Sequence, residues 1–93
     1  MDRRSHIEAR LREELAASHV DVADESHLHA GHAGAASGGG HFRATVVSDR
    51  FAGLSRVARQ RLVFDVLAAE MRAEIHALAL KTFTPGEWAA RAD

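Results

Sequence analysis

Residues 30–40 constrain the fold of this chain more than any other segment, because they have no apolar periodicity. These 11 residues comprise five glycines, four alanines, one serine and His32. Such a composition supplies no side chains for a core and predicts a flexible loop. On the two sides of this loop, residues 19–25 and 41–48 alternate between apolar and polar side chains, as β-strands do. Together they predict a β-hairpin with an unusually long tip.

Three other segments carry helix signals. An apolar residue at every fourth position within 7–15 predicts a helix over residues 5–18, with Ser5 beginning a capping box. A wider apolar stripe predicts a second helix over residues 54–71, broad enough to face a sheet. Residues 84–88 combine a threonine cap, a proline at the first helical position and a glutamate, which predicts a short last helix.

Residues 75–83 alternate again and predict a third strand, with Ile75 on one face and His76 on the other. Both faces are largely apolar, so we expect this strand to be the most buried. The resulting order is α-β-β-α-β-α, and a right-handed crossover would lay the third strand parallel to the second. We therefore predict a single domain over residues 1–93. Its class is α+β, an α/β sandwich in which helices cover one face of a three-stranded mixed sheet.

Composition removes several classes of protein. The chain has 12 Lys+Arg and 13 Asp+Glu, a formal net charge of −1, so it is not a uniformly basic nucleic-acid wrapper. It has no cysteine, which excludes disulfides, a Cys nucleophile and an iron–sulfur site held by this chain alone. No catalytic arrangement stands out, so we do not expect an enzyme. No apolar run approaches the roughly 20 residues of a membrane span, and we expect a cytoplasmic protein without a membrane partner.

Histidine is the distinctive residue, with seven in 93 positions. His27, His29, His32 and His41 fall within 15 residues around the predicted loop, and His76 begins an apolar strand. Imidazole is a common metal ligand, and a loop lets a ligand move into place. The spacing leaves two interpretations open for each group. The loop is either a solvated polar segment or a metal site, and His76 is either bonded to backbone or a fixed ligand.

Four basic residues form the second candidate site: Arg56, Arg59, Arg61 and Lys81. The arginines cluster at the start of the predicted second helix, where anions are favoured. They form either a solvated helix face or a patch that contacts phosphates. The patch is small and is offset by nearby acidic residues, so we expect weak, salt-sensitive binding to nucleic acid.

Several motifs of the chain, in their order and spacing, closely resemble the BolA family. The motifs are Asp24–Ser26, His41–Phe42, Val47–Gly53 and Ile75–Trp88. The resemblance runs from the first predicted helix to Trp88. It implies a BolA-like fold, whose topology is similar to that of the class II KH domain, and the order derived above agrees with it.

The resemblance also implies a partner and a cofactor. Members of this family pair with monothiol glutaredoxins and share a 2Fe–2S cluster, for which glutaredoxin and glutathione supply thiolates. The family histidine of the third strand corresponds to His76, and the loop ligand corresponds to His29, so this chain looks like the His/His type. It would complete one side of the cluster and hold none alone. Imidazole in place of thiolate raises the reduction potential, as in Rieske centres.

Two departures from the family pattern matter. The segment between His29 and His41 lacks the Pro-Pro-Gly type of turn and is longer, so His32 and His41 stay alternative ligands. The family often shows Arg-His-Arg in the second helix, and this chain has Arg59-Gln60-Arg61. The role of the missing central histidine is therefore in doubt here.

Two other functions compete with cluster sharing in iron–sulfur trafficking or iron regulation. Some BolA-like proteins are described as DNA-binding transcriptional regulators of stress, morphology or biofilm responses, which makes DNA the alternative partner. The four basic residues would then contact phosphates. The third possibility is a histidine-rich loop that only takes up zinc or nickel. For the apo form we expect a monomer or a weak homodimer.

Overall fold

The computed structural model describes residues 2–26 and 40–91. Its elements, in chain order, are α1 (Arg3–Glu14), β1 (His19–Asp24), β2 (Gly40–Val47), the 3-10 helix η2 (Asp49–Phe51), α3 (Arg56–Val66), α4 (Ala68–Ala73), β3 (Ile75–Phe83) and α5 (Pro85–Ala90). The predicted order of helices and strands is confirmed, with the second helix divided in two. Most of the predicted loop lies outside the described residues, and Gly40, expected in that loop, begins β2 instead.

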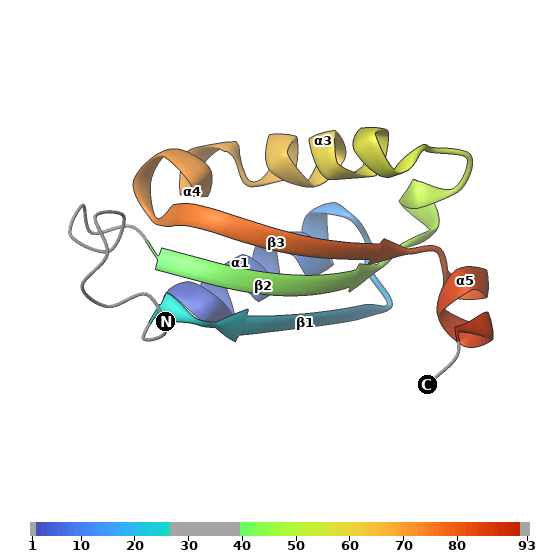
Figure 1. Ribbon diagram of the computed structural model, residues 1–93, viewed down its shortest axis with the longest axis horizontal. Coiled ribbons are helices and arrows are strands. Elements are labelled where there is room, and N and C mark those ends of the chain that lie inside the picture. The colour runs from blue at the N-terminus through green and yellow to red at the C-terminus, as the bar shows by residue number, and fades with distance from the viewer. Residues whose placement is uncertain (1, 27–39, 92–93) are drawn as a thin grey trace.

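The three strands form one mixed sheet in the order β1-β2-β3. β1 and β2 are antiparallel, with Asp24 opposite Phe42, and β2 and β3 are parallel, with Val47 opposite Phe83. The predicted parallel crossover is therefore confirmed. Figure 1 shows α1 behind the sheet, while α3 and α4 run alongside β3.

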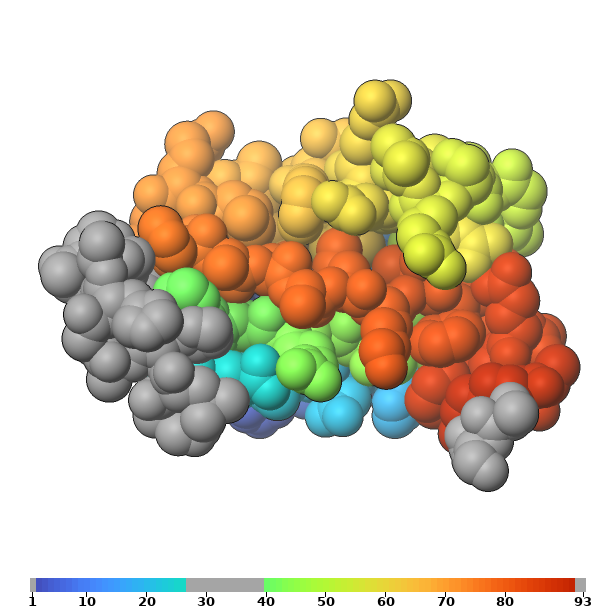
Figure 2. Space-filling view, viewed as in Figure 1, coloured from blue at the N-terminus to red at the C-terminus, as the bar shows by residue number. Residues whose placement is uncertain are grey.

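The core lies between the sheet and the helices on one of its faces. Its buried residues come from α1, all three strands, η2 and the α3–α4 region: Ile7, Leu11, Leu15, Val20, Val22, Phe42, Ala44, Val46, Phe51, Val63, Leu67 and Ile75. None of the described helices covers the opposite face, and side chains of the strands themselves form its surface (Figure 2). This open face is where the sheet meets solvent. Among the described helices, none is both long and apolar enough to span a bilayer.

The first helix begins earlier than predicted and also ends earlier. Asp2 is the N-cap, and its Oδ1 accepts a hydrogen bond of 2.7 Å from the backbone N–H of Ser5. Ser5 is therefore the third helical residue rather than the cap, and the predicted capping box is wrong. A carboxylate at the N-cap is as good an acceptor as a hydroxyl, and it also favours the positive end of the helix dipole.

The second predicted helix begins two residues later than expected, at Arg56, and does not continue unbroken to its predicted end. Ser55 accepts a 3.1 Å hydrogen bond from the backbone N–H of Ala58 and is the N-cap. The helix is interrupted at Leu67, whose ψ of 19° departs from helical values. Leu67 is fully buried, so the apolar stripe passes through the break unchanged.

The third strand has the predicted bounds, but it is not the most buried strand. Among the described strands it pairs only with β2, so it lies at the edge of the sheet, and Ala77 and Ala79 are exposed. Ile75 is also misassigned by simple alternation. The pairing shifts from Gly40 opposite Ile75 to His41 opposite Ala77, and Ile75 joins the core face together with Leu78. A bulge-type irregularity thus allows both apolar side chains to be buried.

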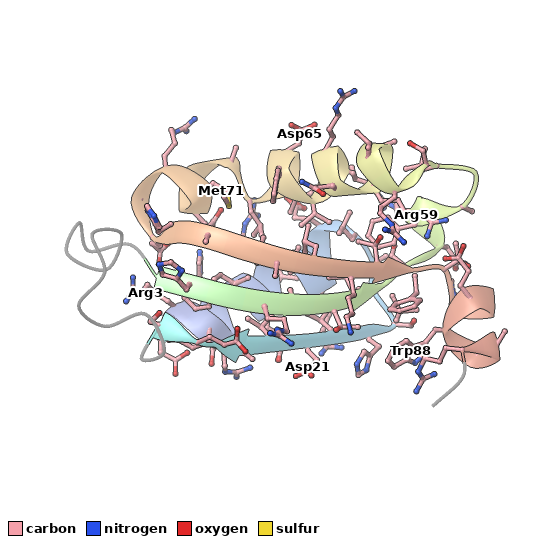
Figure 3. All side chains as sticks on the ribbon, viewed as in Figure 1. Arg3, Asp21, Arg59, Asp65, Met71 and Trp88 are labelled. Carbon is pink, nitrogen blue, oxygen red and sulfur yellow. The ribbon has the colours of Figure 1, made fainter. Side chains whose placement is uncertain are left out.

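The last helix begins as predicted, with a complete capping box between Thr84 and Glu87 and Pro85 in its first turn. It lies at the end of the sheet opposite the start of β2 (Figure 1). Trp88 projects from it toward the strands (Figure 3). Its ring stacks on His19 at a centroid distance of 4.8 Å, so α5 is fastened to the first residue of β1.

Candidate functional site

The structure brings two of the predicted ligand residues together. The imidazole rings of His41 and His76 lie 5.1 Å apart between centroids and are tilted by 45°. His41 is the second residue of β2 and is half-buried, and His76 is the second residue of β3 and is exposed. The pair therefore stands where the two parallel strands begin.

The register shift at the start of β3 positions His76. Because His41 is paired with Ala77 and Gly40 with Ile75, His76 is the extra residue of the irregularity. A bulge re-aims the side chain of such a residue away from regular alternation. In consequence, His76 reaches solvent beside His41 without disturbing the buried side chain of Ile75.

Two hydrogen bonds, one of them to the side chain of Ser26, close the hairpin directly beside His41. The N–H of Glu25 donates to the carbonyl oxygen of His41 at 2.8 Å, and the N–H of His41 donates to Ser26 Oγ at 3.0 Å. Residues 27–39 therefore connect two points that are held together.

His29 and His32 lie outside the described residues, so the choice of loop ligand stays a prediction. What the described residues offer is a donor set of imidazoles at the entrance of the sheet. Beside His41, a depression on the open face is lined by Glu25, Phe42 and residues 77–79. Arg43 and Glu25 form an ion pair of 3.5 Å at its margin. This end of the molecule thus combines candidate metal ligands with an apolar and charged surface.

In the second candidate site, the group of four basic residues, Arg59 has a structural role. Arg59 donates two hydrogen bonds, of 2.6 and 3.1 Å, to the carboxylate of Glu87, and its Nε donates to the carbonyl of Leu54 at 3.0 Å. The side chain of Arg59 is only 13% exposed. The hydrogen bonds from Arg59, together with the backbone N–H of Thr84, lower the pKa of Glu87 to about 2. Arg59 is therefore a link between α3 and α5.

The remaining three basic residues are exposed: Arg56, Arg61 and Lys81. Arg56 and Lys81 line one groove between the start of α3 and the second half of β3. Leu80, Thr82 and Phe83 complete its lining. The structure thus places two cations along one depression, at the end of the sheet away from the histidine pair.

Sequence reasoning missed a third group of side chains. His6 of α1 lies beside Glu70, the third residue of α4, and Glu74, the C-cap of α4. One ligand atom from each of the three lies within 4.8 Å of the others. The pattern is invisible in the sequence, because His6 and Glu70 are 64 positions apart. The only available signal was Glu70 itself, a charged residue on the apolar stripe that runs through Leu67.

The comparisons with known proteins agree with the fold. The BolA-like protein family matches residues 11–87. The chain is 48% identical over 82 residues to the DNA-binding transcriptional regulator BolA of Vibrio cholerae, covering 88% of this chain and 74% of that protein. It is 41% identical to the Escherichia coli protein of the same name, with coverage of 91% and 78%.

Solved structures give the same result. The BolA domain of SufE1 from Arabidopsis thaliana superposes with a TM-score of 0.82 at 38% identity, covering 94% of this chain and 96% of that one. BolA1 from the same plant superposes with a TM-score of 0.80 at 36% identity, with the same coverage. Sequence and structure therefore lead to one conclusion: the chain belongs to the BolA-like protein family.

Proposed function

We propose that this protein is a non-enzymatic adaptor that pairs with a monothiol glutaredoxin and completes the coordination of a 2Fe–2S cluster shared with that partner and glutathione. The observation that carries the proposal is the His41–His76 pair at the entrance of β2 and β3. It stands beside the two anchored ends of the segment that contains His29 and His32. Ligands from a rigid strand and from the adjoining segment would meet there.

The donor chemistry of the chain fits one half of such a cluster. The sequence contains no cysteine, so thiolates have to come from the partner and from glutathione. His76 is exposed and follows a buried residue of β3, which makes it the fixed ligand in this proposal. His29 supplies the second imidazole, and His32 and His41 are the alternatives.

Imidazole ligation gives the shared site two properties. Neutral nitrogen ligands raise the reduction potential of a cluster relative to thiolates. An imidazolium cannot bind a metal, so the association weakens in acid. Among the described helices, none lies over the open face of the sheet, and His76 is exposed.

The test is a titration of a glutaredoxin-bound 2Fe–2S cluster with this protein, followed by visible circular dichroism. The wild-type chain is expected to change the spectrum with one-to-one stoichiometry, and His76→Ala is expected to leave it unchanged. His19→Ala is the matched control, because His19 lies at the other end of the sheet against Trp88. A spectrum that the wild type leaves unchanged, or that His76→Ala changes equally, contradicts the proposal.

The groove lined by Arg56 and Lys81 supports a second candidate function, DNA binding. Two relatives bear the name DNA-binding transcriptional regulator. If these cations contact phosphates, Lys81→Ala weakens binding of duplex DNA for all sequences and reduces the salt slope by about 1. Arg72→Ala is the control, since Arg72 is exposed on α4 and does not line this groove. Equal losses for both variants would point to net charge rather than to the groove.

A further inference from the structure

We propose that His6, Glu70 and Glu74 form a binding site for a divalent transition-metal ion such as Zn²⁺, and that the bound ion fastens α1 to α4. The site is separate from the His41–His76 pair. It lies on the helical side of the sheet and rests on contacts that the proposed function does not use.

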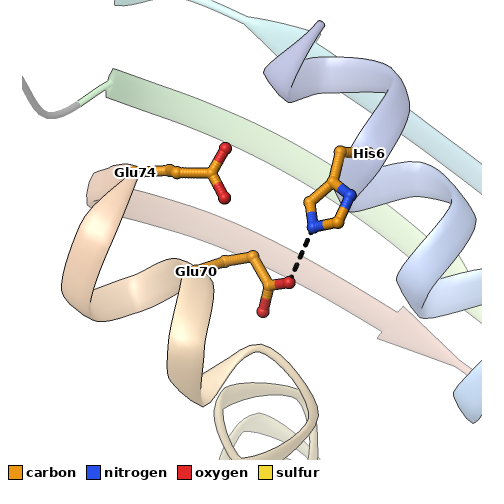
Figure 4. A group of neighbouring side chains, drawn as sticks. All are labelled: His6, Glu70 and Glu74. Carbon is orange, nitrogen blue, oxygen red and sulfur yellow. Dashed lines mark hydrogen bonds and ion pairs between the residues drawn. The ribbon is translucent and has the colours of Figure 1, made fainter. Parts of the chain in front are cut away.

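The three side chains converge from two helices, as Figure 4 shows. His6 Nε2 lies 2.8 Å from Glu70 Oε2, and one ligand atom of each residue lies within 4.8 Å of the other two. Ligand atoms bound to a tetrahedral zinc at about 2.0 Å are about 3.3 Å apart, so Glu74 has to move inward. Glu74 is half-buried at the end of α4, where a carboxylate has the freedom to rotate.

Glu70 provides the second, independent observation. The residue is only 6% exposed, and its Oε1 has no hydrogen-bond partner among the described residues. A buried carboxylate oxygen without a partner carries the full cost of its lost hydration, and such atoms are rare in native structures. A metal ion held by both oxygens of this carboxylate would satisfy this atom.

The protonation state of Glu70 suits a ligand. Burial acts to raise its pKa, but its own backbone N–H, His6 and Arg10 outweigh burial, so the pKa of Glu70 lies below its ordinary value. An ionised carboxylate only accepts, so the hydrogen of the His6–Glu70 bond belongs to His6 Nε2. A metal ion that binds Nε2 therefore takes the place of this hydrogen, and the neutral imidazole carries its hydrogen on Nδ1 instead.

Arg10 offsets part of the negative charge of Glu70. Its Nε lies 3.4 Å from Glu70 Oε2, the oxygen that also faces His6. Figure 4 shows the other oxygen turned away from His6, so an ion between the three side chains meets Oε2 first and Oε1 as the second oxygen of a bidentate carboxylate. A set of one imidazole and two carboxylates favours zinc and its first-row neighbours, because magnesium and calcium prefer oxygen ligands alone.

The first experiment measures thermal unfolding with and without Zn²⁺ in a background that carries His27→Ala, His29→Ala and His32→Ala. This background removes the histidines of residues 27–39 as competing ligands. An ion that binds only the folded state raises the melting temperature. We expect His6→Asn to abolish the Zn²⁺-dependent rise and His76→Ala to retain it. The side chain of His6 is 41% exposed, so its replacement leaves the core intact.

Calorimetric titration of the same variants with Zn²⁺ supplies the second readout. Glu74→Gln is expected to weaken Zn²⁺ binding at least about tenfold, the loss that even indirect partners of a metal cause. Glu13→Gln is the matched control, since Glu13 is an exposed residue of α1 that takes no part in the cluster. A Zn²⁺ response that survives both His6→Asn and Glu74→Gln overturns the proposal.

Discussion

Arg59 and Glu87 form a two-point ion pair, in which one guanidinium donates two hydrogen bonds to both oxygens of one carboxylate. This pair joins the first turns of α3 and α5, which are otherwise separated by α4 and β3. Glu87 Oε1 also accepts a 2.8 Å hydrogen bond from the N–H of Thr84, so the same carboxylate caps its own helix. One ionised group therefore holds two helix ends.

The ion pair predicts a specific loss of stability in acid. Its hydrogen bonds lower the pKa of Glu87 from 4.5 to about 2, so the stabilisation is complete above about pH 4.5 and is lost as the pH falls toward 2. Glu87→Gln keeps an acceptor for Thr84 but removes the charge, and it should flatten the pH dependence in this window. Urea unfolding at a series of pH values measures the effect. Glu13→Gln is the control, and an equal change in it would refute the assignment.

The hydroxyl of Ser48 is expected to contribute strongly to the free energy of unfolding. It is 1% exposed, and its Oγ donates to the carbonyl of Leu15 at 2.6 Å while accepting from the N–H of Arg50 at 3.0 Å. Ser48→Ala leaves that buried carbonyl unsatisfied and should lower the free energy of unfolding by about 1–3 kcal/mol. Ser55→Ala removes an exposed cap and should cost only about 1 kcal/mol. Urea denaturation compares the two, and equal costs would contradict the role given to Ser48.

The structure beside His41 is expected to depend on a glycine at position 40, where there is no space for a Cβ atom. A Cβ at this position would stand 2.5 Å from the ring of Phe42 and 3.1 Å from Ser26 Oγ. Gly40→Ala should therefore destabilise the fold by about 1–3 kcal/mol through overpacking, and should shift the amide resonance of His41, which bonds to Ser26. Gly86→Ala is the matched control, because no atom there lies closer than 4.0 Å. Unchanged stability in Gly40→Ala would show that the strand yields at little cost.

Substitutions at the adjacent residues Ile75 and His76 are expected to have very different effects on the free energy of unfolding. His76 is exposed, so His76→Ala should change the free energy of unfolding by less than about 0.5 kcal/mol. Ile75 is 4% exposed, and Ile75→Ala should cost about 2–5 kcal/mol. Chemical denaturation of both variants tests this pair. A large cost for His76→Ala would make the residue structural and would remove its value as a probe of metal binding.

Local patterns predicted those parts of the fold that local chemistry decides. The bounds of β3 and the capping box of Thr84 are confirmed, because alternation and capping involve neighbours in the sequence. The break at Leu67 escaped prediction, since the apolar stripe continues through it. The cap at Asp2 was missed because Ser5 offers the same chemistry three residues later.

The sites depended on contacts between distant residues and were predicted less well. His76 was singled out as a polar residue in an apolar strand, but its position beside His41 follows from a register shift between parallel strands. Alternation also placed Ile75 on the wrong face for the same reason. The acidic cluster of α4 with His6 requires the packing of α1, which no spacing within either helix reveals.

The hydrogen bonds between Glu25, Ser26 and His41 have a consequence for how such a protein changes over generations. They close the hairpin at its base. The pairing register of β1 and β2 therefore does not depend on the number of residues between Ser26 and Gly40. Doubling the length of a closed segment costs only about 0.6 kcal/mol. Insertions, deletions and exchanges of side chains between Ser26 and Gly40 therefore leave the scaffold in place. Descendants of one gene are free to change the residues there while they inherit the same sheet.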